Sequence, residues 1–202
     1  MDVTASLIYI GGLDMKQVRI PSFLHDVFGE TQRVGSILAI LLFGGLLTAA
    51  LYFTFPEMTA GLPVWRSALA LLLMFDIFSG CIANFTASTS NFYAARKTNR
   101  LVFIAIHVHV VIVALLLQAD IRHSIAVWVY TITGAFVVNA LIGKQSQLFA
   151  AGLLLSVGLG CMPLLPEIQP YMLIICTLFM VKVLLSFAVD HYGKATNTGG
   201  EG

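Results

Sequence analysis

Four ionisable residues lie in the middle of stretches that are otherwise apolar, and they constrain this chain more than any other feature. They are Asp76, His107, His109 and Lys182. A charge at the centre of a bilayer-spanning helix costs about 2.5–3.5 kcal/mol on insertion scales, so such residues normally face protein or water. These four residues are therefore the first candidates for a functional site.

The composition predicts a membrane protein. Hydrophobic residues make up 58% of the 202 residues and charged residues only 10%, whereas about a quarter of a typical soluble domain is charged. Six apolar stretches reach the length of about 18 residues that indicates a membrane-spanning helix. They are 34–55, 64–85, 101–118, 124–142, 148–165 and 170–189. Because backbone polar groups in lipid must be satisfied within each segment, we expect an all-α, polytopic protein with a compact bundle of six transmembrane helices.

The positive charges predict the orientation of this bundle, because short cytoplasmic loops carry an excess of Lys and Arg. With the N-terminus inside, eight such residues fall on the cytoplasmic side and two, Arg66 and Arg122, on the other. The eight are Lys16, Arg19, Arg33, Arg96, Lys97, Arg100, Lys144 and Lys194. We therefore expect a multi-pass protein of the cell membrane with both termini in the cytoplasm.

The chain divides into three predicted regions: a cytoplasmic N-terminal segment (1–33), the transmembrane domain (34–190) and a disordered cytoplasmic tail (191–202). In the first region, LIYI and QVRI flank a Gly-Gly-Leu-Asp stretch and predict a short hairpin. The segment PSFLHDVFGE that follows predicts an interfacial helix, with a loosely ordered tail as the alternative.

Depth in the membrane groups the polar residues into two layers, since each helical residue adds about 1.5 Å. The four central residues form one layer. The second layer, nearer the cytoplasm, consists of Asn84, Thr86, Asn139, Ser186 and Asp190. The two layers predict a polar pathway that is open to the cytoplasm and closed near the middle of the membrane.

Helical spacing predicts where the side chains point. Asn84 follows Asp76 by eight residues, and Asp190 follows Lys182 by eight; residues at this spacing share a face. We expect both faces to point into the bundle. A spacing of two residues places side chains about 200° apart on a helix. We therefore expect the His107 ring to face the interior, whereas His109 points into a groove against a neighbouring helix.

Structural interpretations of the same residues remain open. Asp76 and Lys182 fit an ion pair that only joins two helices. The histidines fit neutral rings bonded to a hydroxyl or carbonyl group, and Asn84 and Asn139 fit interhelical hydrogen bonds.

Two further sets of residues predict contacts with partners. The first is a basic loop whose three residues are expected to fix the topology and to touch lipid head groups, with a phosphate site as the alternative; it comprises Arg96, Lys97 and Arg100. The second is a stripe of small residues at steps of four, which permits close helix packing within the bundle or in a homo- or hetero-oligomer; it comprises Gly152, Ser156 and Gly160.

The sequence argues against several kinds of partner. The net charge of +1 implies no nucleic acid. The HVH motif lacks the spacing of three or four residues that zinc ligands take on a helix, so we expect no metal. The three cysteines fall inside predicted spans, where we expect them to be small buried residues. We also expect no cofactor.

Three functions fit these observations. The first, which we favour, is transport of a small solute or of protons through the Asp/His/Lys layer, because histidine titrates near neutral pH. The second is an accessory or assembly subunit that binds other membrane proteins or lipids. The third is a membrane-embedded lipid-modifying enzyme with Asp76 and His107 as base and orienting group. We expect a protein that is not an enzyme, and we assign no catalytic residue. In size and six-helix layout, the chain resembles in outline the small substrate-binding subunits of energy-coupling-factor importers, without a shared motif.

Overall fold

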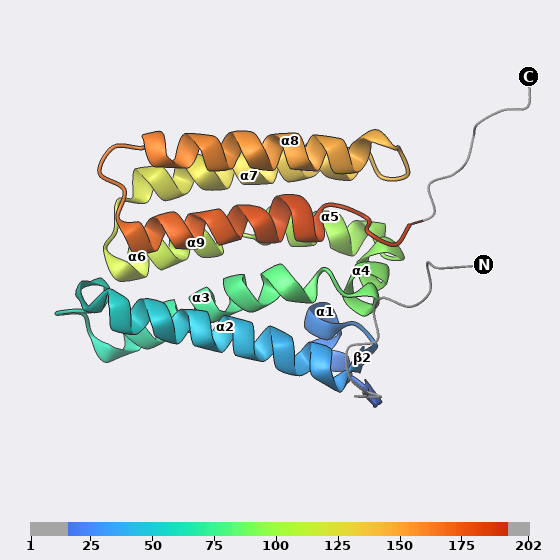
Figure 1. Ribbon diagram of the computed structural model, residues 1–202, viewed down its shortest axis with the longest axis horizontal. Helices are drawn as coiled ribbons and strands as arrows, with labels where there is room; N and C mark the ends of the chain where they lie inside the picture. Colours follow the sequence, from blue (N-terminus) through green and yellow to red (C-terminus); the bar gives the residue numbers. More distant parts are fainter. Residues whose placement is uncertain (1–15, 194–202) are drawn as a thin grey trace, which may run out of the picture.

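Long helices packed side by side make up the structure, a computed structural model that describes residues 16–193 (Figure 1). Within these residues, six stretches are helical, long enough and apolar enough to cross a membrane. Their bounds are Val34–Thr54, Val64–Ala83, Thr98–Leu117, Ile121–Ala140, Ser146–Leu164 and Pro170–Phe187. The predicted all-α class with six candidate membrane spans is confirmed.

Three of these spans are single uninterrupted α-helices, whereas the third, fifth and sixth are composed of more than one helical piece. The pieces are α2 (Val34–Thr54), α3 (Val64–Ala83), α5 (Lys97–Ile106) and α6 (His109–Leu117), α7 (Ile121–Ala140), α8 (Ser146–Cys161) with the turn η3 (Met162–Leu164), and α9 (Pro170–Met180) with η4 (Val181–Phe187). A short helix, α4 (Ala87–Ala94), joins the second span to the third, and the 3-10 turn η2 (Pro56–Met58) follows the first.

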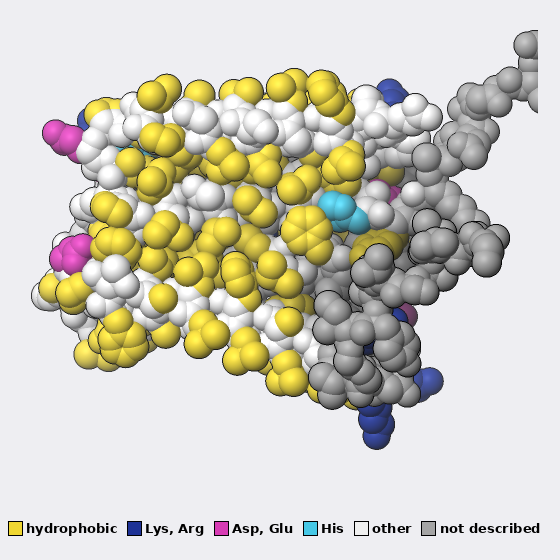
Figure 2. All heavy atoms as spheres, in the orientation of Figure 1, with side chains coloured by type: hydrophobic (Ala, Val, Ile, Leu, Met, Phe, Trp, Pro, Cys, Tyr) yellow, Lys and Arg dark blue, Asp and Glu magenta, His cyan; other side chains and the backbone are white. Residues whose placement is uncertain are grey.

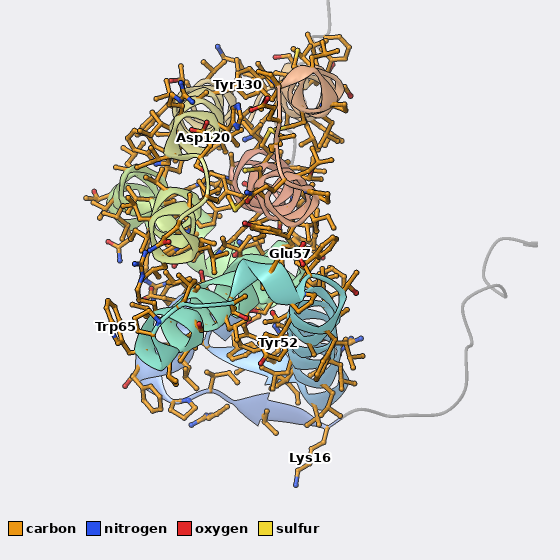
Figure 3. All side chains as sticks on the ribbon, turned by 90° about the vertical axis from the view of Figure 1, so that its left-hand side faces the viewer. Lys16, Tyr52, Glu57, Trp65, Asp120 and Tyr130 are labelled. Carbon is orange, nitrogen blue, oxygen red and sulfur yellow. The ribbon has the colours of Figure 1, made fainter. Side chains whose placement is uncertain are left out.

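Seen end-on, the bundle consists of three stacked pairs of helices (Figure 3): α2 beside α3, α6 beside α9, and α7 beside α8. The sixth span is the most enclosed, because α9 and η4 contact α3, α7 and α8. Four of its side chains are completely buried: Ile175, Cys176, Phe179 and Leu184. By contrast, α2 lies at the edge and packs mainly against α3. The core therefore follows the axis of the sixth span.

The N-terminal segment is docked against one end of the bundle, which we call the α4 end. Strand β1 (Gln17–Arg19) pairs antiparallel with β2 (Thr31–Arg33), and η1 (Ser22–Leu24) and α1 (His25–Phe28) lie between them. The strand QVR thus pairs with residues 31–33, while the other half of the predicted hairpin lies outside the described residues, as does 194–202. The predicted interfacial helix is present only as these two short turns.

Hydrogen bonds hold α1 against α4. The Thr89 hydroxyl donates to the Val27 carbonyl at 3.2 Å, and the Tyr93 hydroxyl donates to the Asp26 carbonyl at 3.0 Å. Gly29 ends α1 with a φ of +73°, and a Cβ there would lie 2.6 Å from the Ser88 backbone, so glycine is required on both grounds. Residues 16–33 are thus folded against the α4 end in the structure.

Apolar side chains cover the sides of the bundle, whereas basic side chains gather at the α4 end (Figure 2). Exposed apolar residues occur on the first five spans and include Leu46, Leu72, Ile106, Val129 and Phe149. A soluble monomer rarely exposes a continuous apolar surface of this kind. The surface and the six spans together indicate a multi-pass membrane protein.

Among residues 16–193, no side chain packs closely on the small-residue stripe of α8. A Cβ added to Gly152 or Gly160 would meet no atom within 4 Å, and Ser156 is exposed. The glycine of α8 that does permit close packing is Gly158, where a Cβ would lie 2.8 Å from the Met180 sulfur. The stripe therefore faces outward, which excludes its expected role inside the bundle.

Candidate functional site

Two of the spans depart from regular α-helix near the predicted polar layer. The third span breaks at His107 and Val108, where His107 has a ψ of 74°. The indole of Trp128 donates to the His107 carbonyl at 2.8 Å, so the break is supported by a hydrogen bond from α7. The sixth span widens into the π-helix η4, in which the Ala188 amide donates to the Val183 carbonyl, five residues earlier, at 3.0 Å. Such π-helical turns are rare and often lie at functional sites.

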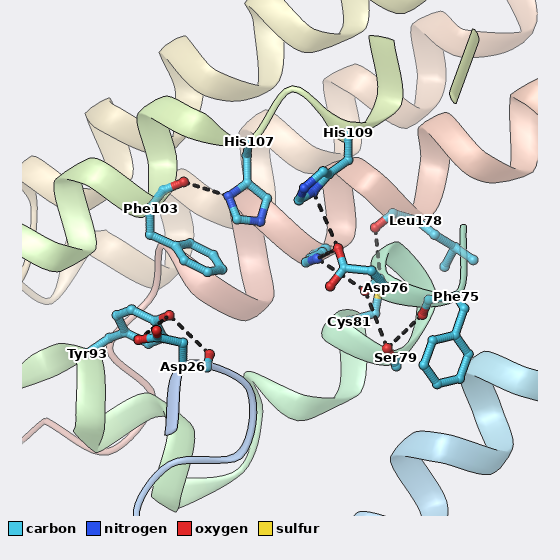
Figure 4. Close-up of polar contacts among 11 residues, drawn as sticks. Asp26, Phe75, Asp76, Ser79, Cys81, Tyr93, Phe103, His107, His109 and Leu178 are labelled. Carbon is cyan, nitrogen blue, oxygen red and sulfur yellow. Dashed lines mark hydrogen bonds and ion pairs between the residues drawn. The ribbon is translucent and has the colours of Figure 1, made fainter. Parts of the chain in front are cut away.

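Asp76, Lys182 and His109 meet at this depth and form what we call the carboxylate cluster (Figure 4). The Lys182 ammonium donates to Asp76 Oδ2 at 2.7 Å and to the Asp76 carbonyl at 3.1 Å. His109 Nδ1 lies 3.3 Å from the same Oδ2, without the alignment of a hydrogen bond. One carboxylate oxygen thus joins the second, third and sixth spans.

His107 lies beside the cluster but does not contact Asp76. Its Nδ1 donates to the Phe103 carbonyl at 2.6 Å, and its ring centroid lies 5.1 Å from that of His109. The ring is 2% exposed, and within residues 16–193 its Nε2 has no hydrogen-bond partner. His107 is buried in the interior, as expected. The histidine that lies beside Asp76 is nevertheless His109, because the break between the two residues changes the angle that a regular helix would give them.

Asp76 does not point into the bundle as predicted. Its side chain is 43% exposed, and that of Lys182 behind it only 3%. Along α3, Asp76 continues the outward stripe formed by Trp65, Leu69 and Leu72, which are 64%, 40% and 61% exposed. The cluster therefore lies at the side of the bundle, with the amine buried and the acid at the surface.

The second predicted layer does not form one connected site. Ser186 donates to the Cys81 carbonyl at 2.8 Å, and Asp190 accepts from the Gly193 amide at 2.9 Å. Asn84 is buried at the end of α3, and Asn139 Oδ1 is buried with no hydrogen-bond partner within residues 16–193. These side chains mostly serve the local ends of helices.

Aromatic rings lie where the pathway to the cytoplasmic side was predicted. The His107 ring packs on Phe103 at 4.0 Å between centroids, and Phe103 stacks on Phe187 at 4.1 Å. Tyr93 from α4 packs against both phenylalanines. Burial and the nearby Asp26 carboxylate raise the pKa of the Tyr93 phenol, which keeps it as a hydrogen-bond donor. Cavities of about 670 and 480 Å³ at the α4 end are lined by no residue of the cluster.

The three basic residues of the loop differ in their surroundings. Arg96 is partly exposed, pairs with Glu30 at 2.9 Å and lies over the Phe92 ring. Lys97 begins α5. Arg100 is 2% exposed and donates to the carbonyls of Phe187 and Ala188 at 3.0 and 2.7 Å. The prediction that Arg100 touches lipid head groups is therefore wrong, since it caps the end of η4.

Gly80 is the residue that lets Lys182 reach Asp76. A Cβ at Gly80 would lie 2.4 Å from Lys182 Cε and 2.8 Å from Nζ. We expect Gly80→Ala to lower the free energy of unfolding by about 1–3 kcal/mol, because the amine must move away from the acid. The matched control is Gly45→Ala in α2, where a Cβ would meet nothing within 4 Å and alanine favours the helix by about 1 kcal/mol. Equal unfolding curves for the two variants in detergent would contradict this role.

Comparison with known proteins finds no matching family model, no matching curated protein and no matching solved structure. Among residues 16–193, no group of three or more His, Cys, Asp or Glu side chains is arranged to hold a metal ion. The fold and the site define an all-helical protein with six candidate membrane spans and a charged cluster at their middle.

Proposed function

We propose that this protein is a cell-membrane transporter in which the carboxylate cluster carries a proton that is coupled to the movement of a small solute. The observation that supports this most directly is the shared oxygen of Asp76, which lies 2.7 Å from the Lys182 amine and 3.3 Å from His109 Nδ1. Ionisable residues inside membrane spans are typical of proton relays in transporters.

The cluster offers two alternative pairings for one acid. With His109 neutral, Asp76 is paired with Lys182. When His109 takes up a proton, it becomes a second cation beside Asp76 Oδ2 and competes for it. An imidazole suits this role because its ordinary pKa is near neutral pH. Protonation of His109 thus changes whether Asp76 pairs mainly with the sixth span, through Lys182, or with the third span, through His109.

The backbone around the cluster supports movement of this kind. Interrupted helices near the middle of the membrane form the ion and substrate sites of many transporters. In this chain the break at His107–Val108 divides the third span, and η4 widens the sixth. A change of pairing at Asp76 therefore acts on two spans whose helices are already irregular.

For orientation, we propose that the α4 end lies in the cytoplasm. Seven basic residues of the described chain lie there, just before β1, in β1 and β2, between α4 and α5, in the first turn of α5 and in the α7–α8 connection, and two lie at or near the opposite end, in the first turns of α3 and α7. This distribution follows the excess of Lys and Arg on cytoplasmic loops.

The test is proton flux into liposomes that contain the full chain and a pH-sensitive dye. We expect His109→Gln to reduce the flux about a hundredfold, the lower range for removal of a proton-transfer group, while the Asp76–Lys182 pair stays in place. The control is Asp120→Asn, which alters a carboxylate paired with Arg122 at 2.9 Å outside the spans. No flux in the unaltered protein, with or without candidate solutes, would refute the proposal.

A further inference from the structure

One oxygen of the acid in the carboxylate cluster receives no hydrogen bond from the described part of the chain. Both contacts of the Asp76 carboxylate, from Lys182 and from His109, are made to Oδ2. Within residues 16–193, no hydrogen bond reaches Oδ1. Because 43% of this side chain is exposed, Oδ1 is open to a donor that comes from outside the bundle. A carboxylate oxygen without a donor in apolar surroundings is unfavourable.

The surroundings of Oδ1 limit which kind of molecule can carry the hydrogen-bond donor. On α3, the exposed neighbours one and two turns away are Leu72 and Leu69. On the third span, the exposed residues nearest the break on this side include Val102 and Ile106, at 52% and 60%. A molecule that reaches Oδ1 therefore lies along an apolar surface at the side of the bundle. It must be largely apolar, with a donor at one position.

The charge of the cluster determines whether a charged ammonium group or a neutral hydroxyl group is the better hydrogen-bond donor to Oδ1. Asp76 and Lys182 carry opposite unit charges and already neutralise each other at 2.7 Å. An ammonium group at Oδ1 would leave one positive charge unmatched in apolar surroundings, which is costly. A hydroxyl group supplies the missing hydrogen bond and leaves the sum of charges at zero. The complementary group is therefore a neutral hydroxyl.

We propose that Asp76 Oδ1, beside His109, binds the hydroxyl group of a neutral, largely apolar molecule that enters from the side of the bundle, such as a long-chain alcohol. The chain of that molecule would lie against the exposed leucines of α3 and the apolar residues before the break. This site goes beyond the proposed proton movement, because binding does not require flux.

The experiment uses the full chain in lipid nanodiscs and a long-chain alcohol with a photoreactive diazirine in its alkyl chain. Its methyl ether, which cannot donate, and its primary amine are used as matched probes. Labelled peptides are located by mass spectrometry. We expect the alcohol to label α3 and α6 at least about tenfold more than the ether does, the effect of one hydrogen bond to a charged group.

Two variants separate binding from folding. Asp76→Leu combined with Lys182→Met removes the acid without leaving a buried charge, and we expect it to lose the preferential labelling by the alcohol. The control variant Asp120→Asn, which alters a carboxylate outside the spans, keeps the labelling. Equal labelling by alcohol and ether, stronger labelling by the amine, or labelling that survives in the double variant would each overturn the proposal. Alcohol-specific labelling without proton flux would refute only the transport function, and flux without labelling only this site.

Discussion

Asp76→Leu is expected to lower the free energy of unfolding by about 3–5 kcal/mol, the range for removing one partner of a buried ion pair. The reason is that Lys182, which is 3% exposed, would keep its charge among apolar side chains without an anion. Lys182→Met is expected to cost less, because Asp76 is 43% exposed and His109 can become protonated beside it. The measurement is reversible unfolding of each variant in mixed detergent micelles.

The double variant, Asp76→Leu with Lys182→Met, provides the control for this asymmetry. Replacing a whole buried pair by apolar residues of similar volume is often neutral or stabilising. We therefore expect the double variant to unfold close to the unaltered protein. If it is as unstable as Asp76→Leu alone, the loss comes from the changed surface of α3 and not from the stranded amine.

Arg100→Met is expected to destabilise the protein by about 2–4 kcal/mol, because hydrogen bonds that involve a charged group contribute about 1.5–3 kcal/mol each. The guanidinium donates to the carbonyls of Phe187 and Ala188. Ala188 keeps a second donor, Gln147, at 3.1 Å, which limits the loss. Unfolding in mixed micelles measures the stability, and size-exclusion chromatography measures the folded fraction.

Arg96→Met is the matched control, since Arg96 lies one turn away on the same loop and helix. Its ion pair with Glu30 is exposed, with side chains 38% and 60% accessible, and such pairs contribute about 0–1 kcal/mol. A loss for Arg96→Met that equals the loss for Arg100→Met would mean that basic charge at this end, and not the cap on η4, stabilises the fold.

The apolar spans could be predicted from the sequence because their signal is additive over many residues. The break in the third span could not be predicted from the sequence. The residues around it, Ile106 to Val108, include neither Pro nor Gly, the usual local signals of a helix break. The break is stabilised instead by the indole of Trp128, which lies 21 residues further along the chain. Its consequence is the contact of His109 with Asp76, which helical spacing did not predict.

The roles of Arg100 and Asp76 depended on packing in the same way. In the sequence, Arg100 is one of three basic residues close together, and nothing distinguishes it from the other two. In the structure it is buried because η4 packs against it. Four-residue spacing places Asp76 on a face with Leu72 as well as with Gly80. Which side of the helix meets the bundle is decided by the neighbours of α3. The charged residues of the apolar spans predicted which side chains lie near each other, but not the direction in which they point.

The balance of charge in the cluster determines how membrane voltage acts on it. While both imidazoles are neutral, the opposite charges of Asp76 and Lys182, 2.7 Å apart, experience equal and opposite forces in an electric field. A field across the bilayer therefore does not drive the empty cluster in either direction. One added proton gives it a net charge, on which the field acts with about 2.3 kcal/mol per 100 mV for a full crossing. In the proposed proton transport, voltage would therefore act on the loaded form and not on the return of the empty form.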